Sequence, residues 1–354
     1  MSGGVDSSVT AALLKKRGFK VVGAFMKCWD EVNQFGECTS AEDAEMARQT
    51  AQVIGIPFYS FDFTKEYRQE VFNYFISEYK AGRTPNPDVV CNREIKFGIF
   101  LKKALALGFE YIATGHYVRL KIQNLKHKIK KTKQKNVIYK LYQAKDKNKD
   151  QSYFLWQLTQ EQLRHSIFPI GDYTKDQVRK MARNFGLPNA ERKDSQGICF
   201  MGKIKLEDFL RQYIQEKTGN IIDAETGKIL GKHPGVFFFT IGQRKGIRLP
   251  GGPYWVVEKR IEDNVLVVSK DIKDLYKKEV IVTDVNWISG QEPRFPLSCS
   301  AVIRYHHPPA PAKIYKLEDG KYKVKFHHRQ QAIAPGQSIV FYQGQEMLGG
   351  GIMN

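Results

Sequence analysis

Cysteine, acidic residues and long apolar runs are all scarce in this sequence of 354 residues. The five cysteines are Cys28, Cys38, Cys91, Cys199 and Cys299, and no two of them form a Cys-x-x-Cys pair. An odd number of widely spaced cysteines argues against a disulfide framework, and the absent pairs argue against a zinc site. No apolar run approaches the roughly 20 residues of a membrane-spanning helix, and no signal-like segment precedes the first motif. We therefore expect a soluble, cytoplasmic protein without a structural metal.

Acidic residues are outnumbered, because 37 Asp and Glu stand against 56 Lys and Arg, which gives a formal charge of +19. Such an excess attracts polyanions. It is concentrated between residues 119 and 149, where twelve basic residues accompany one acid, Asp146. This stretch is typical of a hairpin, 117–122 with 137–143, whose lysine-rich tip we expect to be a solvated loop. The distribution of charge therefore indicates a polyanionic partner.

A Walker A loop is also missing, because its spacing of Gly, Lys and Ser or Thr does not occur. A different glycine-rich string opens the chain, Ser2-Gly3-Gly4-Val5-Asp6-Ser7-Ser8, and the amphipathic run after it ends at Gly18. The glycines let the backbone approach a ligand closely, and successive N–H groups form an anion-binding concavity. Ser7 or Ser8 as the N-cap would add the partial positive charge of a helix N-terminus. The string predicts a phosphate-binding loop, with a glycine-rich turn that caps an ordinary helix as the alternative.

Met1 stands directly before this loop, although such a loop normally follows a parallel strand. The sequence leaves no room for that strand. Either the true start lies upstream of Met1 or the first strand is missing. The second case would put the activity of the chain in doubt more than its ancestry.

The first two hundred residues alternate apolar runs with amphipathic segments. Strands are expected at 21–26, 58–63 and 111–114, and helices at 43–55, 65–79 and 175–185, the first helix after a capping box at 40–43. This alternation predicts a doubly wound α/β fold with a parallel sheet, which binds ligands at the carboxyl ends of its strands. The glycine-rich loop, Met26 and Gly115 all lie at such ends. We therefore expect an adenine nucleotide at this edge.

The α/β pattern stops near residue 200. A helix at 206–214 leads into turn-rich strands, and short β runs then follow at 279–285, 297–304, 312–317, 321–326 and 338–342. Such spacing predicts a small β-barrel. We expect three domains: a catalytic domain at 1–200, a central domain at 201–273 and a C-terminal β-barrel at 274–354.

A second candidate segment runs from Thr84 to Gly98, where two prolines precede a helix expected to begin near Asn92. Cys91 would then lie at a helix N-terminus, with Arg93 and Lys96 close by in sequence. The helix dipole and these cations would favour a thiolate. Asp88 could act as an acid or a base. The alternative for this segment is a capped loop with a buried cysteine.

Two further stretches have the composition of sites rather than of regular structure. Residues 148–154 combine a cation, amide and hydroxyl donors and aromatic rings, a mixture suited to phosphate contact and base stacking. Residues 193–200 contain a glycine and lack periodicity, which indicates a loop with Cys199 accessible in it.

Together these motifs resemble those of tRNA-specific 2-thiouridylases over nearly the whole chain. The matching segments are 1–9, 84–98, 113–118, 148–155, 193–202, 240–246, 304–305, 334–342 and 348–351. The resemblance implies an ATP-pyrophosphatase (PP-loop) domain, a small central domain and a C-terminal β-barrel. It also implies 2-thiolation of the wobble uridine in tRNAs for Lys, Glu and Gln.

The chemistry of that reaction suits the residues. The C2 oxygen of uracil is a poor leaving group, and adenylation by ATP with release of pyrophosphate would let it leave as AMP. Sulfur must then arrive in a form that does not diffuse away, as a cysteine persulfide does. By resemblance, Cys199 carries the persulfide, Cys91 attacks it to release the sulfur, and a disulfide between the two remains. Asp88 would be the acid or base.

The other implied site residues follow from the same resemblance. ATP would be bound by Met1, Ser2, Gly3, Gly4, Val5, Asp6, Ser7, Ser8, Met26 and Gly115. Because a carboxylate beside phosphates can position Mg²⁺, we expect Asp6 to have that role. The flipped target base would face Asn86, Pro87 and Asp88. Lys149, Asp150, Gln151, Arg304 and Tyr305 would contact tRNA. The implied partners are tRNA and a persulfide sulfur-donor protein, with no membrane.

Two other functions share part of this pattern. A small-molecule ATP pyrophosphatase, such as an amidotransferase synthetase, has the loop but needs neither Cys91, Cys199 nor a basic hairpin. A catalytically impaired tRNA-binding homologue would explain the missing first strand. Pyrophosphate release with and without tRNA distinguishes all three.

Overall fold

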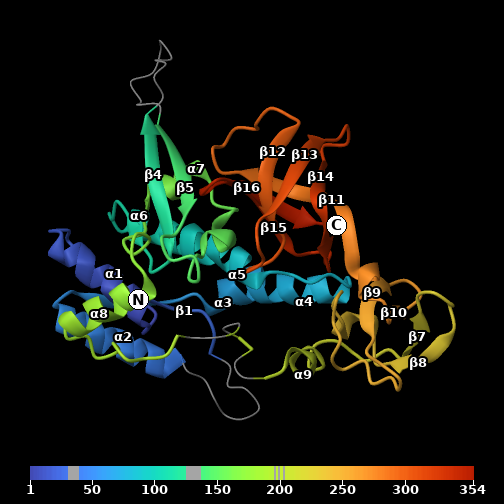
Figure 1. Ribbon diagram of the computed structural model, residues 1–354. Helices are drawn as coiled ribbons and strands as arrows, with labels where there is room; N and C mark the ends of the chain where they lie inside the picture. Colours follow the sequence, from blue (N-terminus) through green and yellow to red (C-terminus); the bar gives the residue numbers. More distant parts are fainter. Residues whose placement is uncertain (31–39, 125–136, 195–196, 198–199, 202–203) are drawn as a thin grey trace.

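The computed structural model describes residues 1–354 except 31–39, 125–136, 195–196, 198–199 and 202–203. Cys38, Cys199 and the lysine-rich tip of the predicted hairpin lie outside the described residues. Figure 1 shows an α/β domain that holds the N-terminus, a β-barrel that holds the C-terminus, and a smaller β domain beside both.

The parallel sheet of the α/β domain is seen, within the described residues, as two pairs of strands. β1 (Gly23–Lys27) pairs with β2 (Phe58–Asp62), and β3 (Ile112–Ala113) pairs with β6 (Ser166–Ile167). The helices around them are α1 (Val5–Lys16), α2 (Ser40–Ile54), α7 (Gln160–Arg164) and α8 (Lys175–Asn184). The expected parallel α/β arrangement is confirmed. The expected capping box is wrong, because Ser40 already belongs to α2.

Two helical passages contain wider, π-helical turns. The first consists of α3 (Thr64–Tyr67), η1 (Arg68–Phe72) and α4 (Asn73–Lys80), and the second of α5 (Pro87–Val90), η2 (Cys91–Ile99) and α6 (Phe100–Ala106). Both η1 and η2 are π-helical. Such turns are rare and often occur at functional sites.

The central domain is a four-stranded sheet that packs on the first of these passages. After α9 (Leu206–Leu210), its strands run in the order β8-β7-β10-β9, with bounds β7 (Gly219–Asp223), β8 (Ile229–His233), β9 (Trp255–Arg260) and β10 (Val265–Ser269), and with η4 (Val236–Phe238) between β8 and β9. Its buried Ile221 and Leu266 belong to the same apolar cluster as Tyr67 and Phe75 of the α/β domain. The two domains therefore share one core.

The C-terminal strands close into a barrel, as predicted. After η5 (Ile272–Leu275) they pair in the order β11 (Tyr276–Trp287), β14 (Tyr322–Gln331), β13 (Ala310–Lys316), β12 (Leu297–Val302), β15 (Ser338–Gln343) and β16 (Glu346–Met353). β16 then pairs back onto β11. The sequence pattern missed β16, because it contains three consecutive glycines, which are depleted in strands.

The predicted basic hairpin is present and extends the sheet of the barrel. β4 (Val118–Asn124) pairs with β5 (Val137–Gln143), and β5 pairs with β16, with Tyr142 opposite Glu346. The Tyr142 hydroxyl donates to Glu346 Oε2 at 2.9 Å, and Lys140 forms an ion pair with the same carboxylate at 2.9 Å. A segment of the α/β domain is therefore fixed to the barrel (Figure 1).

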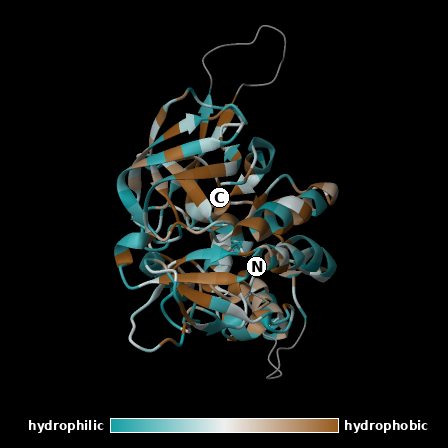
Figure 2. Ribbon diagram, turned by 90° about the vertical axis from the view of Figure 1, so that its right-hand side faces the viewer, coloured by the Kyte–Doolittle hydropathy of each residue, from teal (hydrophilic) through white to brown (hydrophobic). Residues whose placement is uncertain are grey.

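Strand β13 of the barrel shows the alternation that one buried face requires, whereas Ser338 to Tyr342 of β15 are all buried. In β13, Ala310, Ala312 and Ile314 are buried while the residues between them are exposed. Figure 2 shows the corresponding alternation of hydrophobic and hydrophilic residues along these ribbons. Of the helices in the described ranges, none is both long and apolar enough to cross a bilayer.

Candidate active site

The glycine-rich loop leads directly into α1 and leaves the first turn of that helix without a side-chain cap. Gly4 is the N-cap, with extended backbone, and the helix begins at Val5. The prediction of a serine N-cap is wrong: the Ser7 and Ser8 hydroxyls both donate to the Gly4 carbonyl, at 3.1 and 3.0 Å. The first N–H groups of a helix have no intrahelical acceptor. Here they point out of the helix N-terminus, where an anion is favoured.

The glycines of this region let three backbone segments meet. Gly3 has φ +73°, and a Cβ there would lie 2.7 Å from the Asp43 carbonyl oxygen. A Cβ on Gly115 would lie 2.7 Å from both the Asp6 carbonyl carbon and the Ser7 nitrogen. The segment after β3 therefore lies against the loop, which confirms that these two predicted site segments are brought together.

Two other predicted nucleotide residues lie in β1 or beside it. The Met1 amino group donates to the Ala24 carbonyl, and Met1 Sδ is the nearest atom to a Cβ built on Gly23. Met26 packs against the apolar cluster that also holds Cys91. The loop therefore lies beside β1, and β1 packs on the apolar cluster that contains Cys91.

The Asp6 carboxylate is bound on two sides by groups that the sequence did not single out. Lys175 Nζ donates to both carboxylate oxygens, at 2.8 and 2.9 Å, and the Tyr117 hydroxyl donates to Oδ1 at 2.8 Å. Lys175 is the first residue of α8, and its side chain is almost fully buried. Lys175 and Tyr117 therefore fix the position of the Asp6 carboxylate at the start of α1.

The same lysine reaches a second carboxylate. Lys175 Nζ lies 2.7 Å from Asp194 Oδ1, and Asp194 also receives Lys149 at 2.7 Å and Arg179 at 3.3 Å. Burial acts to raise the pKa of Asp194, but hydrogen bonds from Lys149 and Lys175 outweigh it and lower that pKa. Asp6, Lys175, Asp194 and Lys149 thus form a chain of contacts, which we call the Asp194 network.

The helix that carries Cys91 starts earlier than the sequence indicated. It begins at Pro87, with Asn86 as the N-cap whose side chain accepts from the Val89 N–H at 3.4 Å. Cys91 is therefore one turn inside the helix, at the start of η2, and not at its N-terminus. The dipole argument for a thiolate is weaker there, because the effect falls off within the first turn. Asn86 has the capping residue type, and this signal was available in the sequence.

The surroundings of Asp88 shift the pKa of its carboxyl. Its residue is exposed, yet the surrounding protein raises the pKa of its carboxyl, with Lys96 opposing the shift. His116 is buried, and burial, with Lys96 adding to it, lowers its pKa well below the usual range. Thr114 Oγ1 lies 2.8 Å from His116 Nδ1. These shifts favour the protonated form of the Asp88 carboxyl and the neutral form of the His116 ring.

Cys91 itself is buried in an apolar cluster. It shares that cluster with Phe200, whose ring lies 5.1 Å from Phe75 and 5.4 Å from Phe72. Phe200 follows Cys199 in the sequence, but Cys199 lies outside the described residues.

The predicted tRNA-contacting segments come together through aromatic packing. The Tyr305 ring lies 4.5 Å from the ring of Phe154, and Arg304 beside it is exposed. The side chains of Asp150 and Gln151 are used inside the protein: Asp150 accepts from the Ala144 N–H at 2.7 Å, and Gln151 accepts from the Tyr117 N–H at 3.0 Å.

Residues of the barrel hold the backbone of the segment before Asp88. Gln337 Nε2 donates to the carbonyls of Thr84 and Pro85, at 2.9 and 3.1 Å, and the Thr84 N–H donates to the Pro335 carbonyl at 2.8 Å. Residues 334–342 belong to a motif that the sequence did show. The barrel therefore holds the backbone of the segment that leads to Asn86 and Asp88.

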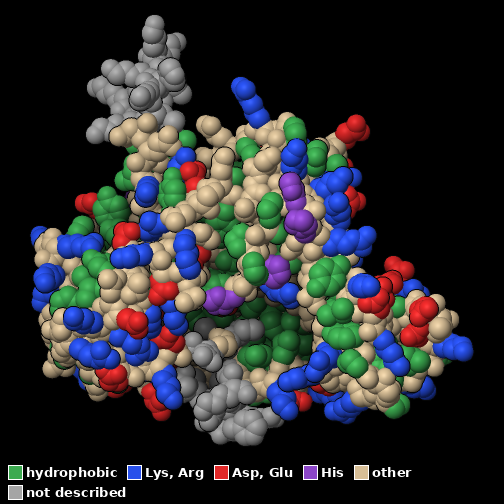
Figure 3. All heavy atoms as spheres, viewed as in Figure 1, with side chains coloured by type: hydrophobic (Ala, Val, Ile, Leu, Met, Phe, Trp, Pro, Cys, Tyr) green, Lys and Arg blue, Asp and Glu red, His purple; other side chains and the backbone are tan. Residues whose placement is uncertain are grey.

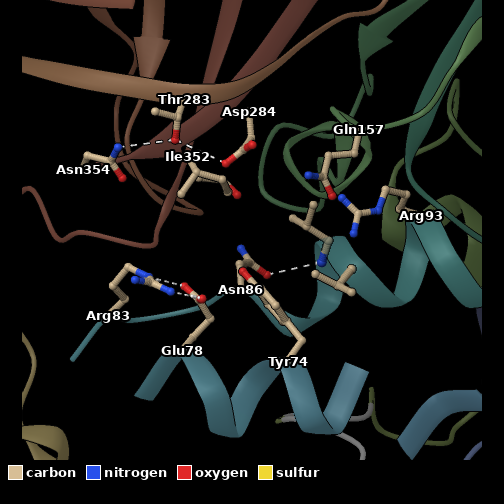
Figure 4. Close-up of a pocket in the computed structure, with 13 residues that line it drawn as sticks. Tyr74, Glu78, Arg83, Asn86, Arg93, Gln157, Thr283, Asp284, Ile352 and Asn354 are labelled. Atoms are coloured by element: carbon tan, nitrogen blue, oxygen red, sulfur yellow. Dashed lines mark hydrogen bonds and ion pairs between the residues drawn. The ribbon is translucent and has the colours of Figure 1, made fainter. Parts of the chain in front are cut away.

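A cavity of about 270 Å³ lies between the helix that carries Cys91 and the barrel. Asn86, Val89, Val90 and Arg93 line it at helical spacing, together with barrel residues such as Asp284 (Figure 4). Asp88 and Cys91 are not among its lining residues, because they occupy the other face. Arg93, which is close to Cys91 in the sequence, forms an ion pair with Glu94 at 2.5 Å.

The three domains surround a hollow in one face of the molecule. Figure 3 shows it between the α/β domain on the left, the barrel above and the central domain on the right, with hydrophobic side chains on its floor. Among the described residues, no group of three or more His, Cys, Asp or Glu side chains could hold a metal ion.

Comparison with known proteins agrees with this architecture. Residues 1–203 match the tRNA methyl transferase HUP domain, 207–270 the tRNA methyl transferase PRC-barrel domain, and 277–353 the aminomethyltransferase beta-barrel domain.

Relatives match over the full chain. A tRNA-specific 2-thiouridylase MnmA of Geobacillus thermodenitrificans is 44% identical over 100% of this chain and 93% of its own length. The tRNA-specific 2-thiouridylase MnmA of Alkaliphilus oremlandii is 46% identical over 99% of this chain and 94% of its own length. The MnmA of Streptococcus agalactiae serotype Ia is 43% identical over 100% of this chain and 94% of its own length. At this identity and coverage, the chain belongs to the tRNA-specific 2-thiouridylase family.

Proposed function

We propose that this protein is an ATP-dependent tRNA 2-thiouridylase that replaces the C2 oxygen of the wobble uridine with sulfur. The observation that carries the proposal is the match of all three domains to 2-thiouridylases over essentially the full chain. We propose domain limits of 1–200, 201–273 and 274–354, and action in the cytoplasm on tRNAs for Lys, Glu and Gln.

The loop at Ser2–Ser8 suits ATP as the activating substrate. The uncapped first turn of α1 offers backbone N–H donors, and Gly3 and Gly115 keep side chains away from the space where phosphates would lie. Mg²⁺ is commonly held by one or two carboxylates together with substrate phosphates. Asp6 would supply such a carboxylate, and the ion would neutralise charge on the phosphates.

The sulfur chemistry would use both cysteines. Cys199 carries a persulfide, and the Cys91 thiolate attacks its inner sulfur, so that the terminal sulfur leaves with the electrons of the S–S bond and a Cys91–Cys199 disulfide forms. The freed sulfide attacks C2 of the adenylated uridine, and AMP departs with the former C2 oxygen. Asp88, whose pKa is raised by its surroundings, would move the proton in this step. A reductant must then open the disulfide.

RNA would enter the hollow that the three domains surround. Asn86, Pro87 and Asp88 would face the flipped base, and Lys149 to Gln151 with Arg304 and Tyr305 would hold the backbone beside it. Phe154, packed on Tyr305, keeps the last two segments together. A persulfide-carrying donor protein would reload Cys199.

The proposal is tested by pyrophosphate release with and without tRNA. We expect release to rise by at least about tenfold when unmodified substrate tRNA is added, because the acceptor of the adenylyl group is the uridine itself. Release that is independent of tRNA would favour a small-molecule ATP pyrophosphatase. Tight tRNA binding without release would favour an impaired tRNA-binding homologue. A methyl transferase would instead transfer a methyl group and would show no dependence on ATP cleavage.

A further inference from the structure

Asp194 receives three cations from two separate segments of the α/β domain. Lys149, from the stretch that precedes η3 (Ser152–Leu155), lies 2.7 Å from Oδ2. Lys175 and Arg179, from the first two turns of α8, lie 2.7 and 3.3 Å from Oδ1. One carboxylate therefore joins α8 to the segment proposed to contact RNA.

Lys175 is shared between Asp194 and the nucleotide loop. Its Nζ contacts both oxygens of Asp6 as well as Asp194, and its residue is only 8% exposed. In this sheltered position ion pairs are screened less than on the surface. A change in the charge around Asp194 therefore alters the strength of the ion pair between Lys175 and Asp6.

Lys149 can be drawn away from this network by an RNA phosphate. Its side chain is 40% exposed, whereas that of Lys175 is 10% exposed. When Lys149 turns to a phosphate, Asp194 keeps its negative charge with one cation fewer. The Lys175 ammonium group is then shared less evenly between the two carboxylates. It moves closer to Asp194, and its ion pair with Asp6 becomes weaker.

We propose that Asp194 is a positioning residue that couples the binding of tRNA to the binding of ATP. Resting on the function proposed above, it makes the two substrates bind cooperatively: tRNA at Lys149 frees the Asp6 carboxylate for the nucleotide complex. By linkage, ATP increases the affinity for tRNA by the same factor. The enzyme would thus avoid holding ATP in a reactive state before its RNA substrate has arrived.

The test measures the Kd of magnesium α,β-methylene-ATP by titration calorimetry, with and without saturating unmodified tRNA, on the full chain. In the native protein tRNA should lower this Kd by about tenfold, within the usual range of coupling. In Asp194→Asn the ratio of the nucleotide Kd without tRNA to the Kd with tRNA should fall below about twofold. Asp194→Glu should restore most of this ratio. The matched control is Glu191→Gln, an exposed carboxylate three residues away that pairs with Arg183 at 2.6 Å. It should behave as the native protein.

A purely structural role for Asp194 would lower the melting temperature and weaken both affinities while leaving their ratio unchanged, and this result would overturn the proposal. If Asp194→Asn does not fold, Lys149→Met provides the second test, because at saturating tRNA it too should remove the ratio. A native chain without any coupling would also overturn the inference, even if it makes 2-thiouridine. A native chain that shows the coupling but makes no 2-thiouridine would leave the inference standing and refute the proposed function.

Discussion

Cys199→Ser should make no 2-thiouridine and yet still release pyrophosphate in the presence of tRNA. If Cys199 carries the sulfur, the serine variant has no persulfide to supply the sulfur that attacks the uridine. The nucleotide loop and the RNA contacts stay intact. Thiolation should fall by on the order of a thousandfold or more, as is usual when a covalent carrier is lost. Nucleoside analysis of the tRNA by mass spectrometry measures the product, and a coupled assay measures pyrophosphate.

The comparison variant is Cys91→Ser, which should still accept a persulfide at Cys199 and then stall. Cys91 is 7% exposed, so the serine could also cost stability, because a buried hydroxyl without a partner costs about 1–3 kcal/mol. Thermal unfolding separates this effect from a lost step. A persulfide found on Cys91 instead of Cys199, or full thiolation by either variant, contradicts the assignment of roles.

Gly115→Ala should weaken ATP binding without changing tRNA binding. The added Cβ would lie 2.7 Å from backbone atoms of Asp6 and Ser7, and backbone, unlike a side-chain end, cannot move aside cheaply. Overpacking of this kind costs about 1–3 kcal/mol, so the Kd for the nucleotide should rise by about tenfold to a hundredfold. Titration with α,β-methylene-ATP measures the change.

The control for this variant is Gly231→Ala in the central domain. Its Cβ would meet only the end of the flexible Leu249 side chain, at 2.9 Å, so nucleotide affinity should be unchanged. Equal losses in the two variants would mean that the Gly115 effect is one of general stability and not of contact with the loop.

The sequence was most informative where function depends on local backbone chemistry. The string Ser2–Ser8 predicted an anion-binding helix start, because glycine conformation and helix polarity are properties of a few adjacent residues. The exact caps were less predictable. Ser7 and Ser8 have the type of an N-cap, but Gly4 takes that position, and the hydroxyls bond back to its carbonyl. The Cys91 helix begins at Pro87 and not near Asn92, because proline suits the first turn of a helix.

The contacts that organise the site were not predictable, because they join residues far apart in sequence. Lys175 meets Asp6 across 169 positions, and Gln337 meets Thr84 across 253. No local sequence pattern specifies such pairs, since each of these residue types is common on protein surfaces. The pairing of β5 with β16 is of the same kind, because the polar face of each strand gives no sign of its partner.

The central claim is that ATP activates the C2 oxygen of uridine, and oxygen-18 placed at that position tests it most directly. Substrate tRNA carrying labelled wobble uridine is incubated with the full chain, ATP and a persulfide donor, and the nucleotides are analysed by mass spectrometry. The account predicts that the label appears in AMP in a one-to-one ratio with 2-thiouridine formed. Label that remains in the uridine, or that appears in water or pyrophosphate while 2-thiouridine accumulates, would contradict it.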